Sequence, residues 1–382
     1  MKALEALAWL PAAIWVYLVL FRGLFWLPSL RLPPTVPLEE WPPVAVVVPA
    51  RNEAAIIGET LPTLLAQQYP GRAEIFLVDD SSDDGTGEVA ASLPRGDLPL
   101  QVVGGADRPP GWVGKTWALH QGVTAAESTD PQWILFTDAD IAHPPDSLSS
   151  LVAAGVHGQR DLVSLMARLR TSTGWEKMIV PAFVYFFSKL YPFRQIARRR
   201  SRTAGAAGGC VLVRTEALVR AGGIPAIAGA VIDDVALGRA VKRSGGSTWL
   251  GYADRVRSVR PYPRLGDLWD MVARSAYTQL RYSPLALVGT VLGLAVIYLG
   301  PPAVTVAGVV TGGAAVMAAG ATAWFLLTAS YVPMVAYYGV GLQWALTLPV
   351  AATIYGAMTV DSARRHRRGA GAAWKGRSYS RV

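Results

Sequence analysis

The chain has 382 residues, of which 52% are hydrophobic and 16% are charged, whereas soluble domains carry about 25% charged residues. The deficit is local, because residues 40–280 have an ordinary charge density and residues 284–360 contain no Asp, Glu, Lys, Arg or His. Length and composition therefore exclude one small soluble domain and indicate a soluble domain combined with membrane segments. The single cysteine, Cys210, excludes an intrachain disulfide.

The net charge of +9 comes largely from two groups of arginines beside apolar stretches. They are Arg194, Arg198, Arg199, Arg200 and Arg202, and Arg364, Arg365, Arg367 and Arg368. In a soluble protein this charge would indicate nucleic acid. Beside membrane segments it indicates anchors against anionic lipid on the cytoplasmic side, so we expect a membrane partner and no nucleic acid. The run 194–202 holds either a lipid phosphate or, as we favour, anionic headgroups.

The chain begins with an apolar run over residues 6–21. It has no basic region before it and no cleavage site of a signal peptide after it. The run predicts a membrane helix over about residues 4–25, with Arg22 at its end, in an N-terminal segment 1–30. Residues 31–43 form a Pro-rich linker.

Strand and helix patterns alternate after the linker. Apolar runs predict strands at 44–48, 74–78, 100–103 and 133–137, and the intervening patterns predict helices at 53–67, 86–92 and 115–126. This alternation predicts an α/β domain with a mostly parallel sheet covered on both faces. Ligands of such sheets bind beyond the carboxyl ends of the strands, where two acidic clusters of this sequence fall.

The C-terminal part predicts a membrane domain. Residues 284–360 are free of charge, so we assign helices that cross the membrane to 283–361 and a basic tail to 362–382. Four spans are favoured over three or two, with breaks near Pro301-Pro302, Gly320 and Gly339–Gly341, because an even number keeps the soluble domain and the tail on one side. Residues 178–193 are apolar and aromatic but short, which favours an interfacial segment.

Asp138-Ala139-Asp140 follows the predicted strand 133–137. Carboxylate oxygens are the ligands that Mg²⁺ and Mn²⁺ prefer, so Asp138 and Asp140 predict a metal site that would bridge a diphosphate. The alternative is a solvated turn or a helix cap.

Two further loops open at the same predicted edge. Asp79 and Asp80 end the strand 74–78 and would accept hydrogen bonds from a base or ribose, although a plain turn explains the same residues. Pro49, Arg51 and Glu53 lead from the first strand into a helix, where a nucleotide diphosphate would lie. A helix cap is the alternative there.

Three more positions carry candidate chemistry. Lys115, in a Gly-containing loop, offers a point charge to phosphate. Asp233 and Asp234 begin a helical pattern, so that one of them is either a general base or part of an N-cap. Arg281 directly precedes the membrane domain and either holds a diphosphate or anchors the membrane face.

In this order the six motifs resemble family 2 glycosyltransferases of the GT-A fold over residues 44–282. The resemblance implies that Asp80 binds the nucleoside, Asp138 and Asp140 the metal and diphosphate, and that Asp234 is the base. The family's Q-x-x-R-W motif is only approximated, since Tyr282 follows Arg281 in place of Trp and Gln279 lies one position too close. That departure argues against processive polysaccharide synthesis.

A narrower resemblance rests on the stretches PGWVGKTWA, LVSLMARL, PAFVYFF, LYPF, GAAGGCVLVR, VIDDVALGRAVK, TWLGY and YSPLALVGT. Together they look like the hopanoid-biosynthesis-associated glycosyltransferases of bacteria, which are related to ceramide glucosyltransferases. The resemblance implies a lipid acceptor but does not identify the sugar. We expect an inverting transfer from a nucleotide-diphosphate sugar, and the arginine groups predict a cytoplasmic catalytic domain on the bacterial inner membrane. The alternatives are a polyprenyl-phosphate acceptor, a polysaccharide synthase, or a membrane protein that only binds nucleotide.

Overall fold

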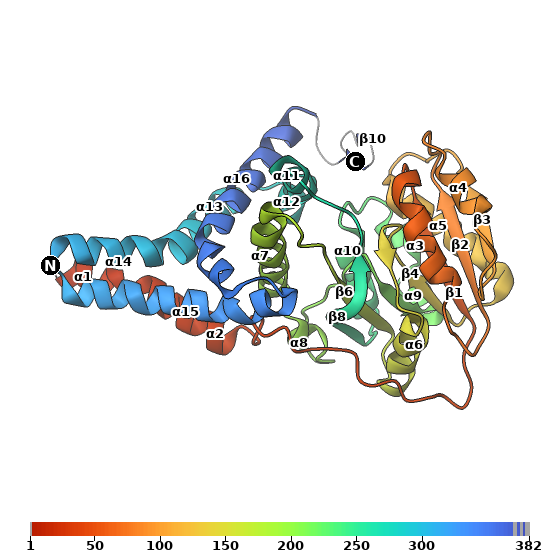
Figure 1. The fold of residues 1–382 in the computed structure, drawn as a ribbon, viewed down its shortest axis with the longest axis horizontal. Coiled ribbons are helices and arrows are strands. Elements are labelled where there is room, and N and C mark those ends of the chain that lie inside the picture. The colour runs from red at the N-terminus through yellow and green to blue at the C-terminus, as the bar shows by residue number, and fades with distance from the viewer. Residues whose placement is uncertain (1, 370–372, 375–376, 379–382) are drawn as a thin grey trace. The chain divides into compact units, whose positions relative to one another are not determined.

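The computed structural model describes residues 2–369, 373–374 and 377–378, and it divides into two compact units. The sheet unit comprises residues 29–170, 195–261 and 373–382, and the helical unit comprises 1–28, 171–194 and 262–372. Figure 1 shows the labelled elements of both. Each unit is made of segments that are distant in the sequence, because the chain passes from one to the other several times.

A mixed sheet of eight strands forms the centre of the sheet unit. The strands are β1 (Val44–Ala50), β2 (Ala73–Asp79), β3 (Leu100–Gly104), β4 (Trp133–Phe136), β5 (Ile141–Ala142), β6 (Leu162–Arg168), β7 (Val211–Arg214) and β8 (Thr248–Ser258), in the order β3-β2-β1-β4-β7-β6-β8-β5. The four predicted strands are confirmed and pair in parallel. Four strands that the sequence pattern did not predict, β7, β6, β8 and β5, extend the sheet beyond β4. Of these, β7 and β5 are antiparallel to their neighbours.

Helices cover both faces of this sheet, as predicted. They are α3 (Ala54–Leu65), α4 (Thr86–Ser92), α5 (Gly114–Ala126), α6 (Ser147–His157), α9 (Thr215–Arg220) and α10 (Asp233–Arg243). Strand β1 is buried on both sides, so Val46 and Val48 belong to one core with α3 and α6 while Ala45 and Val47 belong to the other with α5 and α10. This double burial explains why β1 is a continuous apolar run.

The helical unit contains most of the remaining helices. They are α1 (Lys2–Ala8), α2 (Leu10–Phe21), α7 (Gly174–Leu190), α11 (Leu265–Ala273), α12 (Ala276–Gln279), α13 (Pro284–Leu294), the π-helical η3 (Ala295–Leu299), α14 (Gly300–Thr311), α15 (Ala314–Tyr338) and α16 (Leu348–Arg367). Two continuous helices in the described part of the chain, Pro284–Thr311 and Ala314–Tyr338, are long and apolar enough to cross a membrane.

The expected break at Pro301-Pro302 was wrong. Proline has no N–H, so Pro301 cannot donate to the carbonyl of Ile297 four residues earlier. The indole N–H of Trp15 donates to that carbonyl instead, at 2.8 Å, and the preceding turn widens to a π-helix. The helix therefore continues through the proline pair, as neighbouring side chains permit in membrane helices.

Two other expected boundaries also move. The chain does not break at Gly320 but at Gly312, which adopts a φ of 68° and ends α14, whereas the break at Gly339 is confirmed by its φ of 67°. The single helix expected over residues 4–25 is divided into α1 and α2. Helix α2 ends at Phe21, because Gly23 and Leu24 just after it take positive φ values.

Two glycines inside helices predict opposite effects of the same substitution. A Cβ at Gly122 would lie 2.4 Å from Cγ1 of the buried Val47, whereas at the exposed Gly58 the nearest atom would be 4.0 Å away. Gly122→Ala should lower the free energy of unfolding by about 1–3 kcal/mol through overpacking. Gly58→Ala should raise it by about 0.5–1 kcal/mol through helix propensity. Thermal unfolding of both variants in detergent checks this, and shifts of equal sign would contradict it.

Candidate active site

Five of the predicted site residues line one small pocket in the sheet unit: Pro49, Lys115, Asp138, Asp233 and Asp234. Strands β1 and β4 are parallel neighbours, so their carboxyl ends carry Pro49 and Asp138 to the same edge. Helices α5 and α10 begin at this edge and contribute the other three. The parallel arrangement thus assembles residues that are up to 185 positions apart.

Lys115 joins two of the acidic residues of the pocket. Its Nζ lies 2.7 Å from Oδ1 of Asp138 and 3.1 Å from Oδ2 of Asp233. Burial lowers the pKa of Lys115, but the charges of Asp138 and Asp233 outweigh burial and hold this pKa above its ordinary value. Lys115 therefore stays protonated and reduces the repulsion between Asp138, which follows β4, and Asp233, which begins α10.

Asp234 has a different environment from Asp233. Its Oδ2 accepts a hydrogen bond from the backbone N–H of Gly208 at 2.7 Å, and its Oδ1 accepts one from the N–H of Val235 at 2.6 Å. Burial, and then the negative charge of Asp233, raises the pKa of Asp234 to about 7. Asp234 is therefore a carboxylate that can take up and release a proton near neutral pH.

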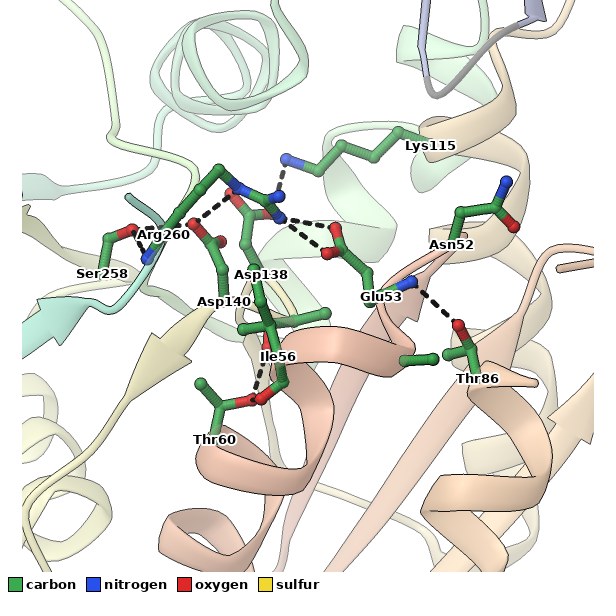
Figure 2. A network of polar contacts seen from close by, with 12 residues as sticks. Asn52, Glu53, Ile56, Thr60, Thr86, Lys115, Asp138, Asp140, Ser258 and Arg260 are labelled. Carbon is green, nitrogen blue, oxygen red and sulfur yellow. Dashed lines mark hydrogen bonds and ion pairs between the residues drawn. The ribbon is translucent and has the colours of Figure 1, made fainter. Parts of the chain in front are cut away.

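Arg260 forms the second cationic bridge (Figure 2). Its Nη2 lies 2.6 and 2.8 Å from the two carboxylate oxygens of Glu53, and its Nε donates to Oδ2 of Asp140 at 3.2 Å. The hydroxyl of Ser258 donates to the same Asp140 oxygen at 2.7 Å. Thr60 of α3 holds the turn itself by donating to the carbonyl of Ala139 at 2.6 Å.

Sequence reasoning missed Arg260 and Ser258. Ser258 is the last residue of β8 and Arg260 lies two positions later, and only the antiparallel pairing of Ser258 with Ile141 brings them beside Asp140. A β5–β8 pair between a two-residue strand and a strand over a hundred residues later leaves no local sequence signal. The arginine itself, directly after a strand and before Pro261, is the one indication that was available.

The loops after β1 and β2 hold each other. The guanidinium of Arg51 donates to the carbonyls of Asp80 and Ser81, and it lies 3.8 Å from Oδ2 of Asp80, whose side chain is fully buried. Asp79 accepts a hydrogen bond from the N–H of Ser82 at 3.0 Å. The Asp79 carboxylate thus stabilises the turn, while the contacts of Arg51 with Asp80 join the loop after β1 to the loop after β2.

Arg281 belongs to the helical unit, unlike the other predicted site residues. It is exposed and has a φ of 51°, and the neighbouring Tyr282 stacks on His366 with ring centroids 4.3 Å apart. The segment that approximates the R-W motif is therefore part of the packing between α12 and α16.

Residues 45–221 match a family model that is described as Glycosyl transferase family 2. This match covers just under half of the chain, and it extends from β1 through β7. A 4,4'-diaponeurosporenoate glycosyltransferase of Staphylococcus aureus (strain bovine RF122 / ET3-1) is 34% identical over 124 residues, which are 32% of this chain and 31% of that protein. The chain therefore matches less than a third of the length of this curated relative.

The mannosyltransferase PcManGT of Pyrobaculum calidifontis, solved with GDP-Man and Mn²⁺, shares the fold. The similarity covers 95% of this chain and 99% of that one, with a TM-score of 0.55 and 22% identity. The mostly parallel sheet with helices on both faces is accordingly a GT-A glycosyltransferase fold, as the sequence predicted. The family 2 match includes Asp80, Asp138 and Asp140 but ends before Asp233.

The acidic edge of the sheet suits a divalent cation. Five carboxylates lie there, those of Glu53, Asp138, Asp140, Asp233 and Asp234, and Lys115 and Arg260 each pair with two of them. Within the residues that the structure describes, no three His, Cys, Asp or Glu side chains are grouped to hold a metal alone. Mg²⁺ usually takes one or two carboxylates together with phosphate oxygens, so Asp138 and Asp140 fit a metal shared with a diphosphate.

Arg260 should be a larger contributor to stability than an exposed arginine of the same domain. Arg260→Met leaves Glu53 and Asp140, both largely buried, without their cation, which should lower the free energy of unfolding by about 2 kcal/mol. The control is Arg255→Met, because the Arg255–Asp146 pair is exposed and should contribute less than about 1 kcal/mol. Thermal unfolding in detergent measures both, and equal losses would contradict the bridging role.

Proposed function

We propose that this protein transfers a sugar, with inversion, from a nucleotide-diphosphate sugar to a lipid acceptor at a membrane. The pocket that joins Asp138, Lys115 and Asp234 carries the proposal, because it combines a phosphate-binding charge, a candidate metal ligand and a candidate base. The family 2 match and the glycosyltransferase names of the relatives support glycosyl transfer.

The donor site would lie at the edge formed by β1, β2 and β4. Asp80 with Arg51 would meet the nucleoside, and Lys115 the diphosphate. Asp138 and Asp140 would hold Mg²⁺ or Mn²⁺, and the solved mannosyltransferase of the same fold contains Mn²⁺. When bound, this metal supplies positive charge to the leaving diphosphate. Arg260 keeps Asp140 in place through its bridge to Glu53.

Asp234 would act as the general base. The acceptor hydroxyl gives its proton to the Asp234 carboxylate, and its oxygen forms a bond with the anomeric carbon of the sugar. The bond from that carbon to the diphosphate oxygen breaks, and the electron pair leaves with the nucleotide diphosphate. Because attack and departure occur on opposite faces, the anomeric configuration inverts. The hydrogen bond from Gly208 fixes the orientation of Asp234 for this step.

The helical unit would lie in the membrane. Only 11% of the most apolar window of Pro284–Thr311 is buried within the protein, and 33% of that of Ala314–Tyr338, whereas a core helix of a soluble protein would be mostly buried. The apolar side chains that remain exposed match a lipid environment. The arginines that flank the apolar helices support a cytoplasmic location for the 44–282 domain and the tail 362–382 in a bacterial cell.

A lipid acceptor agrees with this arrangement. The curated relative is named for the glycosylation of diaponeurosporenoate, a lipid-like acceptor, and the hopanoid-type sequence resemblance implies the same class. A polyprenyl phosphate is the second candidate. It is already anionic and needs no strong base, so the behaviour of Asp234 variants separates the two.

Incubation of the purified protein with labelled nucleotide sugars and a total lipid extract tests the function. One nucleotide sugar should yield a labelled neutral or acidic lipid with inverted anomeric configuration, identified by mass spectrometry and NMR. The reaction should require Mg²⁺ or Mn²⁺ and stop in EDTA, and Asp140→Ala should abolish it. Donor binding without labelled lipid from any extract would instead support a protein that only binds nucleotide.

Asp234→Asn should lower the transfer rate by about 10²–10⁴-fold while the donor affinity stays nearly unchanged, because a base acts on the acceptor only. The amide retains the shape of the carboxylate, so folding should be little affected. The rate at saturating donor and lipid, with donor affinity from calorimetry, measures this effect. Asp233→Asn is the matched control and should be milder. A rate for Asp234→Asn within about fivefold of the wild type would favour the polyprenyl phosphate acceptor.

The pH dependence follows from the same residue. Because the carboxylate must be deprotonated to accept a proton, the rate should fall as the pH is lowered through about 7, the pKa of Asp234. The residual rate of Asp234→Asn should not show this fall. A wild-type rate that is constant between about pH 6 and 8 would contradict the assignment of the base.

A further inference from the structure

Lys189 of the helical unit points into apolar surroundings. Its Nζ donates a hydrogen bond to the hydroxyl of Tyr298 at 2.8 Å, and it lies 4.7 Å from the ring centroid of Tyr298 and 5.8 Å from that of Phe186. Tyr298 is fully buried. A lysine near a helix end usually extends its ammonium to water, so the inward direction of Lys189 needs another explanation.

A second cation lies at the same end of α7. Nε of Arg22 donates to the backbone carbonyl of Lys189 at 3.2 Å, and its Nη2 donates to that of Leu190 at 3.5 Å. Two cationic residues therefore lie at the end of α7, with the guanidinium of Arg22 bound to the backbone there. The partial negative charge of the helix terminus offsets part of this positive charge.

No carboxylate balances the pair. In the part of the chain that the structure describes, no Asp or Glu oxygen lies within 4.0 Å of the cationic nitrogens of Arg22 or Lys189. Carboxylates of the same unit are engaged elsewhere, Asp361 with Arg365 and Glu176 with backbone N–H groups at the start of α7.

Aromatic side chains surround the ammonium. Tyr298 makes edge contacts with Trp15 and Phe186, with ring centroids 5.8 and 5.3 Å apart, and Phe186 also contacts Tyr355 at 5.0 Å. These rings offer an apolar wall and weak attraction to a cation, but no full charge. An ionisable residue in such surroundings of a membrane unit indicates a functional site that requires a partner.

We propose that Lys189 and Arg22 bind the acidic group of a lipid, a phosphate or a carboxylate, whose apolar part contacts the neighbouring aromatic side chains. An anion would pair with the ammonium in a medium of low polarity, where the attraction between opposite charges is strong. Arg22 would add a planar donor surface for the same oxygens. This site rests on the membrane location proposed above but not on glycosyl transfer, so it holds for any acceptor.

Lipid retention in nanodiscs tests the site. The wild-type protein is placed in phosphatidylcholine nanodiscs with added phosphatidic acid, added oleic acid or neither, and native mass spectrometry counts the lipids that stay bound after release. The wild type should retain one of the two acidic lipids in preference to phosphatidylcholine. Lys189→Met should reduce that retention by about tenfold or more, the size expected for a charge-assisted hydrogen bond.

Two variants control for structural damage. Lys177→Met removes another lysine from the same helix α7 and should leave retention unchanged, and Lys189→Arg keeps the charge and should retain the lipid. Where Lys189→Met does not fold, Lys189→Gln replaces it, since an amide can still hydrogen-bond to Tyr298. Equal retention by the wild type and the folded neutral variant would overturn the proposal.

Free inorganic phosphate distinguishes the source of the anion. Acidic lipid that stays bound when phosphate is added to the nanodiscs supports a lipid site, whereas its complete displacement would overturn that assignment. A protein that does not enter nanodiscs would contradict the membrane location and therefore the proposed function as well. A protein that enters them without any preference for acidic lipid would contradict only the site at Lys189.

Discussion

The repulsion among carboxylates gathered at one edge of the sheet is the constraint on which the rest of the candidate site depends. Glu53 precedes α3, Asp138 and Asp140 lie between β4 and β5, and Asp233 and Asp234 begin α10, and the fold brings these three segments together. Like charges at this spacing raise one another's pKa and destabilise the folded state. Lys115 and Arg260 each bind two of these carboxylates, which ties the loops after β1 and β4 to the ends of β8 and the start of α10.

The same charge balance explains how the edge suits its proposed ligands. Lys115 and Arg260 each pair with two of these carboxylates, and carboxylates grouped in this way favour a divalent metal that in turn attracts a diphosphate. Asp234 differs from the other four because backbone N–H groups, not a cationic side chain, are its hydrogen-bond partners. Burial and the charge of Asp233 raise the pKa of this carboxylate, as a general base that acts near neutral pH requires.

The helical unit solves a different physical problem, the satisfaction of backbone groups in apolar surroundings. The Pro301-Pro302 pair removes N–H donors from a long helix, and Trp15 supplies one for the carbonyl of Ile297. Arg22 does the same for the last carbonyls of α7. Both donors come from the N-terminal segment. Helix α2 and the residue just after it therefore donate hydrogen bonds to helices that follow much later in the chain.

The sequence by itself determined the elements whose signals are local. The strand at 44–50 and its neighbours were predictable from continuous apolar runs, and Asp138, Asp233 and Lys115 from their positions at the ends of such elements, because a parallel α/β sheet brings all its strand ends to one edge. Only the tertiary structure decided which charges pair. The antiparallel β5–β8 pair brings Arg260 beside Asp140. Asp79 accepts a hydrogen bond within its own turn, and the hydrogen bond from Trp15 lets the helix continue through Pro301. These outcomes depend on contacts between residues 118 to 282 positions apart or on the competition between a turn and a ligand, and neither leaves a periodic pattern in the sequence.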